Sequence, residues 1–222
     1  MTIDSQNLLE SILQSLDRVS YIRPEEIPGI DLYMDQVTTF MDSHLSASRR
    51  YEDDKILTKT MINNYAKNRL LPPPEKKKYS REHMLLLIFI YYFKSLLSIN
   101  DIQSLLSPLT ERYFHTERPL SLEQVYSEVF SLEKDQIEAM KEDLRQKYSA
   151  SENTFSEAPE EEREFLRLFS FICMLSFDVY LKKQVIEKLI DQLPGQDRSS
   201  GKKHKEKEKE KEKEKEKEKN AE

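Results

Sequence analysis

The run of ten mostly apolar residues from Met84 to Phe93 is the feature that most restricts how this chain can fold. A helix built from this run is apolar on nearly every side, so other elements must surround it. The run stops at Lys94, and the second long apolar stretch is interrupted by Arg167 and Asp178, whereas a membrane span needs about 20 predominantly apolar residues. Both stretches therefore predict buried helices and no membrane segment.

Composition favours helices throughout. The 222 residues include three glycines, too few for a sandwich or barrel with many tight turns, so the predicted fold class is all-α. The single cysteine, Cys173, excludes a disulfide framework, and its apolar neighbours predict an inert thiol in the core. The first residues already include Asp4 and form no signal-peptide pattern, so a cytoplasmic location is expected.

Helical periodicity and its breaks divide the chain into four segments. We expect an N-terminal helix within residues 1–28, a helical core domain over 29–108, a helical C-terminal region over 109–195 and a charged tail over 196–222. The helix that begins at Ser98 is predicted to end before Pro108. The tail is mainly a Lys-Glu repeat with no apolar side chain to bury, which predicts a solvated segment.

The C-terminal region is expected to serve self-association or the sensing of a small-molecule effector. Its aromatic residues predict core or subunit contacts, with an effector pocket as the alternative. These aromatic residues are Phe165, Phe169, Phe171, Phe177 and Tyr180.

Residues 55–81 contain eight basic side chains against one acid, Glu75, although the whole chain has a net charge of −6. This contrast indicates a local site for an anionic partner. Thr58 can cap a helix that runs to Arg69, and the following prolines prevent its continuation. Asn68 offers the left-handed conformation that can end such a helix. The polar residues of this helix are types that contact bases and phosphates in DNA.

The segment from Leu57 to Leu106 resembles the bacterial domain-of-unknown-function family 1836, whose signature is the run from Thr58 to Tyr79. It is also similar, more distantly, to the DNA-binding domain of MerR-type transcriptional regulators. The similarity to MerR lies in the order of the parts: a Thr-capped helix, a Leu-Leu-Pro-Pro-Pro exit, Tyr79-Ser80 opening an apolar helix, and a Ser-Ile-Asn-Asp-Ile start of the next helix. The resemblance implies a winged helix-turn-helix core, with residues 31–45 as its first helix and a wing shorter than that of MerR.

These features predict a sequence-specific DNA-binding transcriptional regulator that binds double-stranded DNA as a homodimer. The recognition helix 58–69 would enter the major groove, and the basic loop 75–81 would hold the phosphate backbone. The alternative is a helical adaptor whose basic stretch docks an acidic protein. The predicted DNA-binding residues are Thr58, Lys59, Thr60, Asn63, Asn64, Tyr65, Lys67, Lys76, Lys77, Lys78, Tyr79 and Arg81.

Catalytic and metal-binding motifs are absent from the sequence. The four histidines lie far apart, and none has a partner at helical spacing, so no metal motif is visible. The three glycines are too scattered to form a phosphate-binding loop. We therefore expect no enzymatic activity and no cofactor.

Overall fold

The computed structural model of the chain describes residues 5–17 and 21–193. Within these ranges the chain consists of packed helices and one two-stranded sheet, which confirms the predicted all-α class. No helix in the described ranges is long and apolar enough to cross a membrane. In chain order the helices, the short 3-10 turns (η) and the strands are α1 (Ser5–Leu16), η1 (Pro24–Glu26), β1 (Leu32–Tyr33), α2 (Met34–Leu45), η2 (Ser46–Ser48), α3 (Lys59–Lys67), β2 (Lys78–Tyr79), α4 (Arg81–Phe93), α5 (Ile99–Tyr113), α6 (Leu122–Ser131), α7 (Glu133–Glu152) and α8 (Glu160–Ile190).

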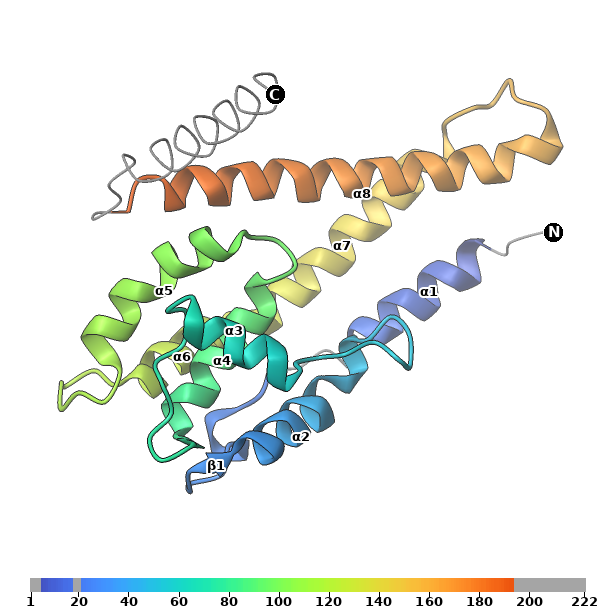
Figure 1. Cartoon of the computed structure of the whole chain (residues 1–222). Helices are drawn as coiled ribbons and strands as arrows, with labels where there is room; N and C mark the ends of the chain where they lie inside the picture. The colour runs from blue at the N-terminus through green and yellow to red at the C-terminus, as the bar shows by residue number, and fades with distance from the viewer. Residues whose placement is uncertain (1–4, 18–20, 194–222) are drawn as a thin grey trace, which may run out of the picture.

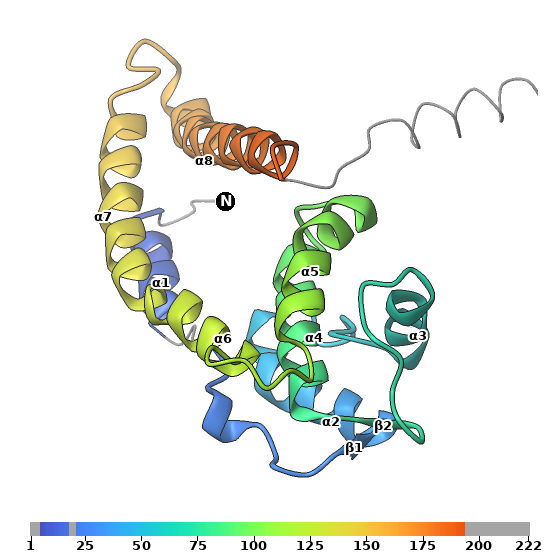
Figure 2. The same cartoon turned by 90° about the vertical axis from the view of Figure 1, so that its left-hand side faces the viewer.

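Helix α4 lies at the centre of the main core, as its apolar run predicts. Its residues 85–88 and Ile90 have no solvent exposure. Helices α2, α3, α5 and α6 surround it (Figure 2), and each contributes buried side chains to the same hydrophobic cluster. The strands β1 and β2 pair in antiparallel register, Leu32 with Tyr79, and thereby attach the chain before α2 to the chain before α4.

The main core extends beyond the predicted domain limits of 29 and 108 at both ends. Ile22 and Ile27 belong to it, and the buried hydroxyl of Tyr126 in α6 donates a hydrogen bond to the carbonyl of Ile22 at 2.6 Å. A buried carbonyl left without this donor would cost free energy, so the bond fixes α6 to the chain that follows α1. The segment around Ile22 is therefore part of the core domain.

Helix α5 corrects the prediction that Pro108 ends a helix. It continues through Pro108 to Tyr113, so the predicted boundary at residue 108 falls inside a helix. Proline removes one backbone hydrogen bond, but Leu109 and Tyr113 beyond it pack against the main core. Burial of these side chains offsets the lost bond.

Helices α7 and α8 form an elbow beside the main core (Figure 1). A smaller cluster joins them to α1 through Leu9, Tyr148 and Phe171, among others. The C-terminal part of α8 packs against the main core through Ile186 and Ile190. The remaining side of α8 is uncovered. Cys173 lies on its uncovered side and is exposed, so the prediction of a core thiol was wrong.

Candidate nucleic-acid interface

The ends of α3 are set by local hydrogen bonds that the sequence encodes. The Thr58 hydroxyl accepts a hydrogen bond from the Met61 amide at 3.2 Å, which confirms Thr58 as the N-cap. At the other end the Leu70 amide donates to the Tyr65 carbonyl at 2.9 Å, around a residue with positive φ. That residue is Arg69, with φ of 58°, and not Asn68 as predicted.

Four polar side chains form one exposed face of α3. Thr60, Asn63, Asn64 and Lys67 are all exposed, and their spacing places them on a single side of the helix. The opposite side is buried, with Ile62 entirely inside the core. We call these four residues the polar stripe.

The basic loop after α3 is a tight turn at residues 75–78. The Lys78 amide donates to the Glu75 carbonyl at 2.8 Å, and the two central residues, Lys76 and Lys77, have φ of 49° and 66°. Two consecutive positive φ values are those of a type I′ turn. This turn lies along the same edge of the molecule as α3 (Figure 2), so both can face one partner.

Three basic residues occupy backbone conformations that ordinarily favour glycine or asparagine. Arg69, Lys76 and Lys77 all have positive φ, at a cost of about 1 kcal/mol each. All three are exposed, and in the described part of the chain none of them forms an ion pair. His115 and Phe155 also have positive φ, so this conformation does not by itself indicate a role for charge. The three exposed basic side chains do concentrate positive charge at the end of α3 and at the turn.

Replacing Lys76 and Lys77 by Asn and Gly, the pair that type I′ turns prefer, is expected to stabilise the protein. The free energy of unfolding in urea should rise by about 1 kcal/mol or more, because the positive φ values no longer cost energy. The double alanine variant is the control, since it removes the same charges but keeps both Cβ atoms. Equal stability of the two variants would contradict the strained turn.

Other predicted residues have structural partners nearby. Lys59 is ion paired with Asp35 of α2, and the Lys78 ammonium lies 5.2 Å from the centre of the Tyr33 ring on β1. These contacts hold α3 and the turn against the elements beside them. Lys59 is nevertheless mostly exposed, so it remains at the edge of the candidate interface.

Four predicted site residues leave the interface. The Thr58 hydroxyl is used as the N-cap of α3, and the other three are buried or have structural partners. Tyr65 and Tyr79 are core residues, with 7% and 3% of their surfaces exposed, and burial raises the pKa of both phenols. The Arg81 guanidinium donates to the Pro24 carbonyl at 2.6 Å and forms an ion pair with Glu123 at 3.1 Å. The two tyrosines and Arg81 hold the core together, and we remove all four residues from the interface.

Arg69 is an interface candidate that the predicted set omitted. The sequence feature that could have identified it is a basic residue directly after the predicted helix, at a position that glycine usually occupies. The revised interface consists of Thr60, Asn63, Asn64, Lys67, Arg69, Lys76 and Lys77, with Lys59 and Lys78 at its edge.

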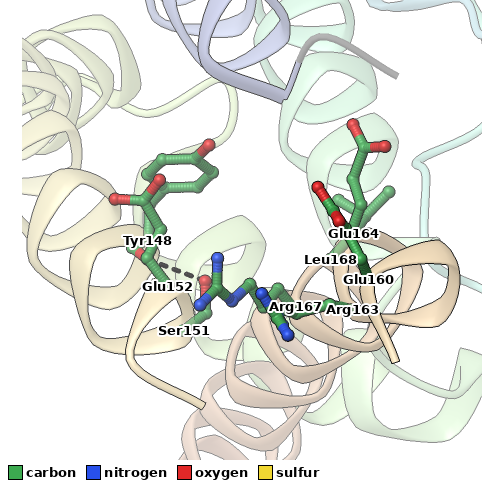
Figure 3. Close-up of a pocket in the computed structure, with 8 residues that line it drawn as sticks. All are labelled: Tyr148, Ser151, Glu152, Glu160, Arg163, Glu164, Arg167 and Leu168. Atoms are coloured by element: carbon green, nitrogen blue, oxygen red, sulfur yellow. Dashed lines mark hydrogen bonds between the residues drawn. The ribbon is translucent and has the colours of Figure 1, made fainter. Parts of the chain in front are cut away.

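A pocket of about 330 Å³ lies at the elbow between α7 and α8, away from this interface (Figure 3). Its polar side chains serve the helix connection: the Ser151 hydroxyl donates to the Tyr148 carbonyl, and Arg163 donates to the Ala158 carbonyl at 2.8 Å. None of the aromatic residues considered for an effector pocket lines it. The lining residues are Tyr148, Ser151, Glu152, Glu160, Arg163, Glu164, Arg167 and Leu168.

Comparison with known proteins places most of the core domain in one family. Residues 22–129 match the family described as a domain of unknown function, DUF1836. The match begins at Ile22 and includes most of α6, whereas the main core also includes Ile190 of α8, beyond the matched residues. No curated protein and no solved structure matches the chain. Within the described residues, no group of three or more metal-binding side chains lies close enough together to hold an ion.

Proposed function

Residues 22–129 belong to the DUF1836 family, and we propose that the chain is a sequence-specific DNA-binding transcriptional regulator without enzymatic activity. In this proposal α3 enters the major groove with the polar stripe toward the bases. Arg69, Lys76 and Lys77 neutralise phosphates on either side of the groove. Such a role would place the protein beside the chromosome, in the cytoplasm.

One observation carries the proposal. Exposed residues of base-reading types on α3, and three exposed basic residues with positive φ that form no ion pair among the described residues, belong to segments on the same edge of the molecule. Asn63 and Asn64 can each form a bidentate contact to adenine, and Thr60 can contact a thymine methyl group.

The order of elements supports a MerR-like arrangement. A strand precedes α2, α3 follows, and a turn leads through β2 into the buried α4. The chain departs from a compact helix-turn-helix in one respect, because residues 46–58 connect α2 to α3, and the usual turn has three or four residues. We propose that α3 acts as the recognition helix and the turn at 75–78 as a short wing. A homodimer would place two such helices on a roughly palindromic operator.

Replacement of Asn63 and Asn64 by alanine is expected to reduce the preference for specific sequences more than the general affinity. The test is selection of bound duplexes from a randomised pool by the full-length chain, followed by affinities for the selected and a scrambled duplex. Loss of one bidentate contact should lower the ratio of these affinities about tenfold or more. Asn100→Ala, at an exposed asparagine of α5, is the matched control and should leave the ratio unchanged. Equal loss on both duplexes would remove the base-reading role.

The adaptor alternative is separated by a competition experiment. Polyglutamate offers the negative charge of an acidic protein without the shape or base edges of a duplex. If the chain is a DNA reader, a selected duplex should be displaced by unlabelled copies of itself far more readily than by polyglutamate at equal charge concentration. Equal displacement would favour docking to an acidic protein and contradict the proposal.

A further inference from the structure

Helix α8 leaves a long side uncovered. It lies across one side of the molecule (Figure 1), and Figure 2 shows α7 and α5 on two different flanks of it. Phe171 and Ile190 are its buried residues, whereas Phe165 and Phe169 are 64% and 51% exposed. Large apolar side chains exposed together on one face mark an interaction surface.

The uncovered side of α8 contains residues that repeat at helical spacing and form one continuous face. The spacings between successive members are three, four, three, one, three, four and three, so they read the same in both directions along the helix. We call this face the α8 seam. It consists of Glu162, Phe165, Phe169, Ile172, Cys173, Ser176, Tyr180 and Lys183, all exposed.

We propose that the α8 seam binds the α8 seam of a second copy of the chain, with the two helices antiparallel. The two-fold axis passes between Ile172 and Cys173. Each seam residue of one copy then lies beside the residue of the other copy that is equally far from the axis in the opposite direction along the sequence. Glu162 then lies beside Lys183 of the copy, and Phe165 beside its Tyr180. A two-fold contact of this kind uses one surface patch twice.

Charge and size both favour a second copy over another partner. The first turn of α8 carries Glu160, Glu161 and Glu162, and basic residues lie near its other end, so antiparallel helices bring opposite charges together. A parallel pair would instead place the glutamates of both copies side by side. Between the Phe165–Tyr180 pair and the axis, the large Phe169 of one copy lies beside the small Ser176 of the other. The small serine leaves room for the phenylalanine ring to pack.

The large apolar side chains of the α8 seam supply about half of the area that a standard interface buries on each partner. The four large side chains Phe165, Phe169, Ile172 and Tyr180 are each about half exposed, which leaves about 100 Å² on each. The polar members and Cys173 add to this area, and a standard interface buries about 800 Å² per partner. Residues 194–222 of the sequence contain no apolar run that could cover the seam instead.

This inference does not depend on DNA binding. It rests on α8, and the candidate interface rests on α3 and the turn at 75–78. The two can fail separately, because the oligomeric state is measured without DNA. Where both hold, the dimer supplies the pair of recognition helices that a palindromic operator needs.

Sedimentation equilibrium of the full-length chain tests the contact. The unmodified chain should be dimeric at micromolar concentration, and Phe169→Asp should raise the dissociation constant at least a hundredfold, because a buried charge replaces a ring contact in both copies. Val185→Asp is the control, since Val185 is 57% exposed and lies on the opposite side of α8 from the seam. Circular dichroism should show equal helix content in both variants. A monomeric unmodified chain, or equal effects of the two variants, would overturn the proposal.

Disulfide cross-linking tests the antiparallel direction. With Cys173→Ser as background, Glu162→Cys together with Lys183→Cys should give a covalent dimer on mild oxidation. Glu162→Cys alone should not, because the two copies of residue 162 would lie about 30 Å apart along the helices. A cross-link through residue 162 alone would show parallel helices and overturn the proposal, as would the absence of any cross-link in the double variant.

Discussion

Alanine in place of Lys67, Lys76 and Lys77 together is expected to weaken binding to a random-sequence duplex by two to three orders of magnitude at about 0.1 M salt. Each lysine that neutralises a phosphate releases about one counterion, so the slope of log K against log salt should become shallower by about three units. The three side chains are exposed and have no ion-pair partner among the described residues, so their removal should not disturb the fold. Fluorescence anisotropy at several salt concentrations measures both quantities.

Removal of three positive charges elsewhere is the control for this variant. Arg23, Arg118 and Arg145 are exposed, and none of them belongs to α3, to the turn at 75–78 or to α8. Alanine at these positions changes the net charge by the same amount but removes no proposed phosphate contact. We expect only a small change in slope. If both triple variants change the slope equally, binding depends on net charge alone and no defined interface is involved.

The second large effect that we expect is a loss of stability in mild acid, caused by protonation of His83. It lies in the first turn of α4 with 1% of its surface exposed, and its Nδ1 accepts a hydrogen bond from the Ser80 amide at 3.0 Å. This contact requires a neutral ring. Burial first, and the neighbouring His115 second, lower the pKa of His83 from 6.5 to about 4, against opposing contributions from the Pro73 and Pro72 carbonyls and Asp31.

The sign of the effect follows from the lowered pKa. Between pH 6.5 and pH 4 the unfolded chain binds a proton at His83 that the folded chain does not, so stability falls as the pH falls. The contribution of neutral His83 to the free energy of unfolding should be fully present above pH 6.5. The free energy of unfolding should be lower by about 3 kcal/mol at pH 4. Urea unfolding at a series of pH values measures this loss.

His83→Gln is the matched variant for the pH experiment. Glutamine at this position can still accept the Ser80 amide hydrogen bond but does not titrate. The difference in unfolding free energy between the unmodified chain and this variant should therefore change by about 3 kcal/mol from pH 7 to pH 4. A difference that stays constant would show that His83 does not control the acid sensitivity.

Local sequence signals were sufficient for the elements that position the interface. The apolar run predicted the buried α4, and Thr58 and the prolines gave the limits of α3 to within two residues. These features depend on helix caps, periodicity and backbone chemistry, which act over a few residues. The exposure of Asn63 and Asn64 agrees with the same helical periodicity.

Long-range packing explains the predictions that were wrong. Tyrosine suits both a core and a polar surface, so the sequence could not show that Tyr65 and Tyr79 are buried. The partner of Arg81 is Glu123, on an element far along the chain, and no local pattern links them. Cys173 has apolar neighbours in the sequence, but the helix turns it to the side that α7 and α5 leave uncovered. Contacts between distant elements decided each case.

The most direct test of the central claim is cleavage of DNA from a reagent attached beside the polar stripe. With Cys173→Ser as background, Asn68→Cys at the end of α3 would carry an iron chelate that cuts nearby DNA, and Ser149→Cys on α7 would carry the same reagent as a control; both native residues are exposed. If α3 faces the duplex, the reagent at residue 68 cuts a selected duplex within a few base pairs, and the reagent at 149 does not. Equal cutting from both positions, or none from residue 68 while the duplex is bound, would contradict the account.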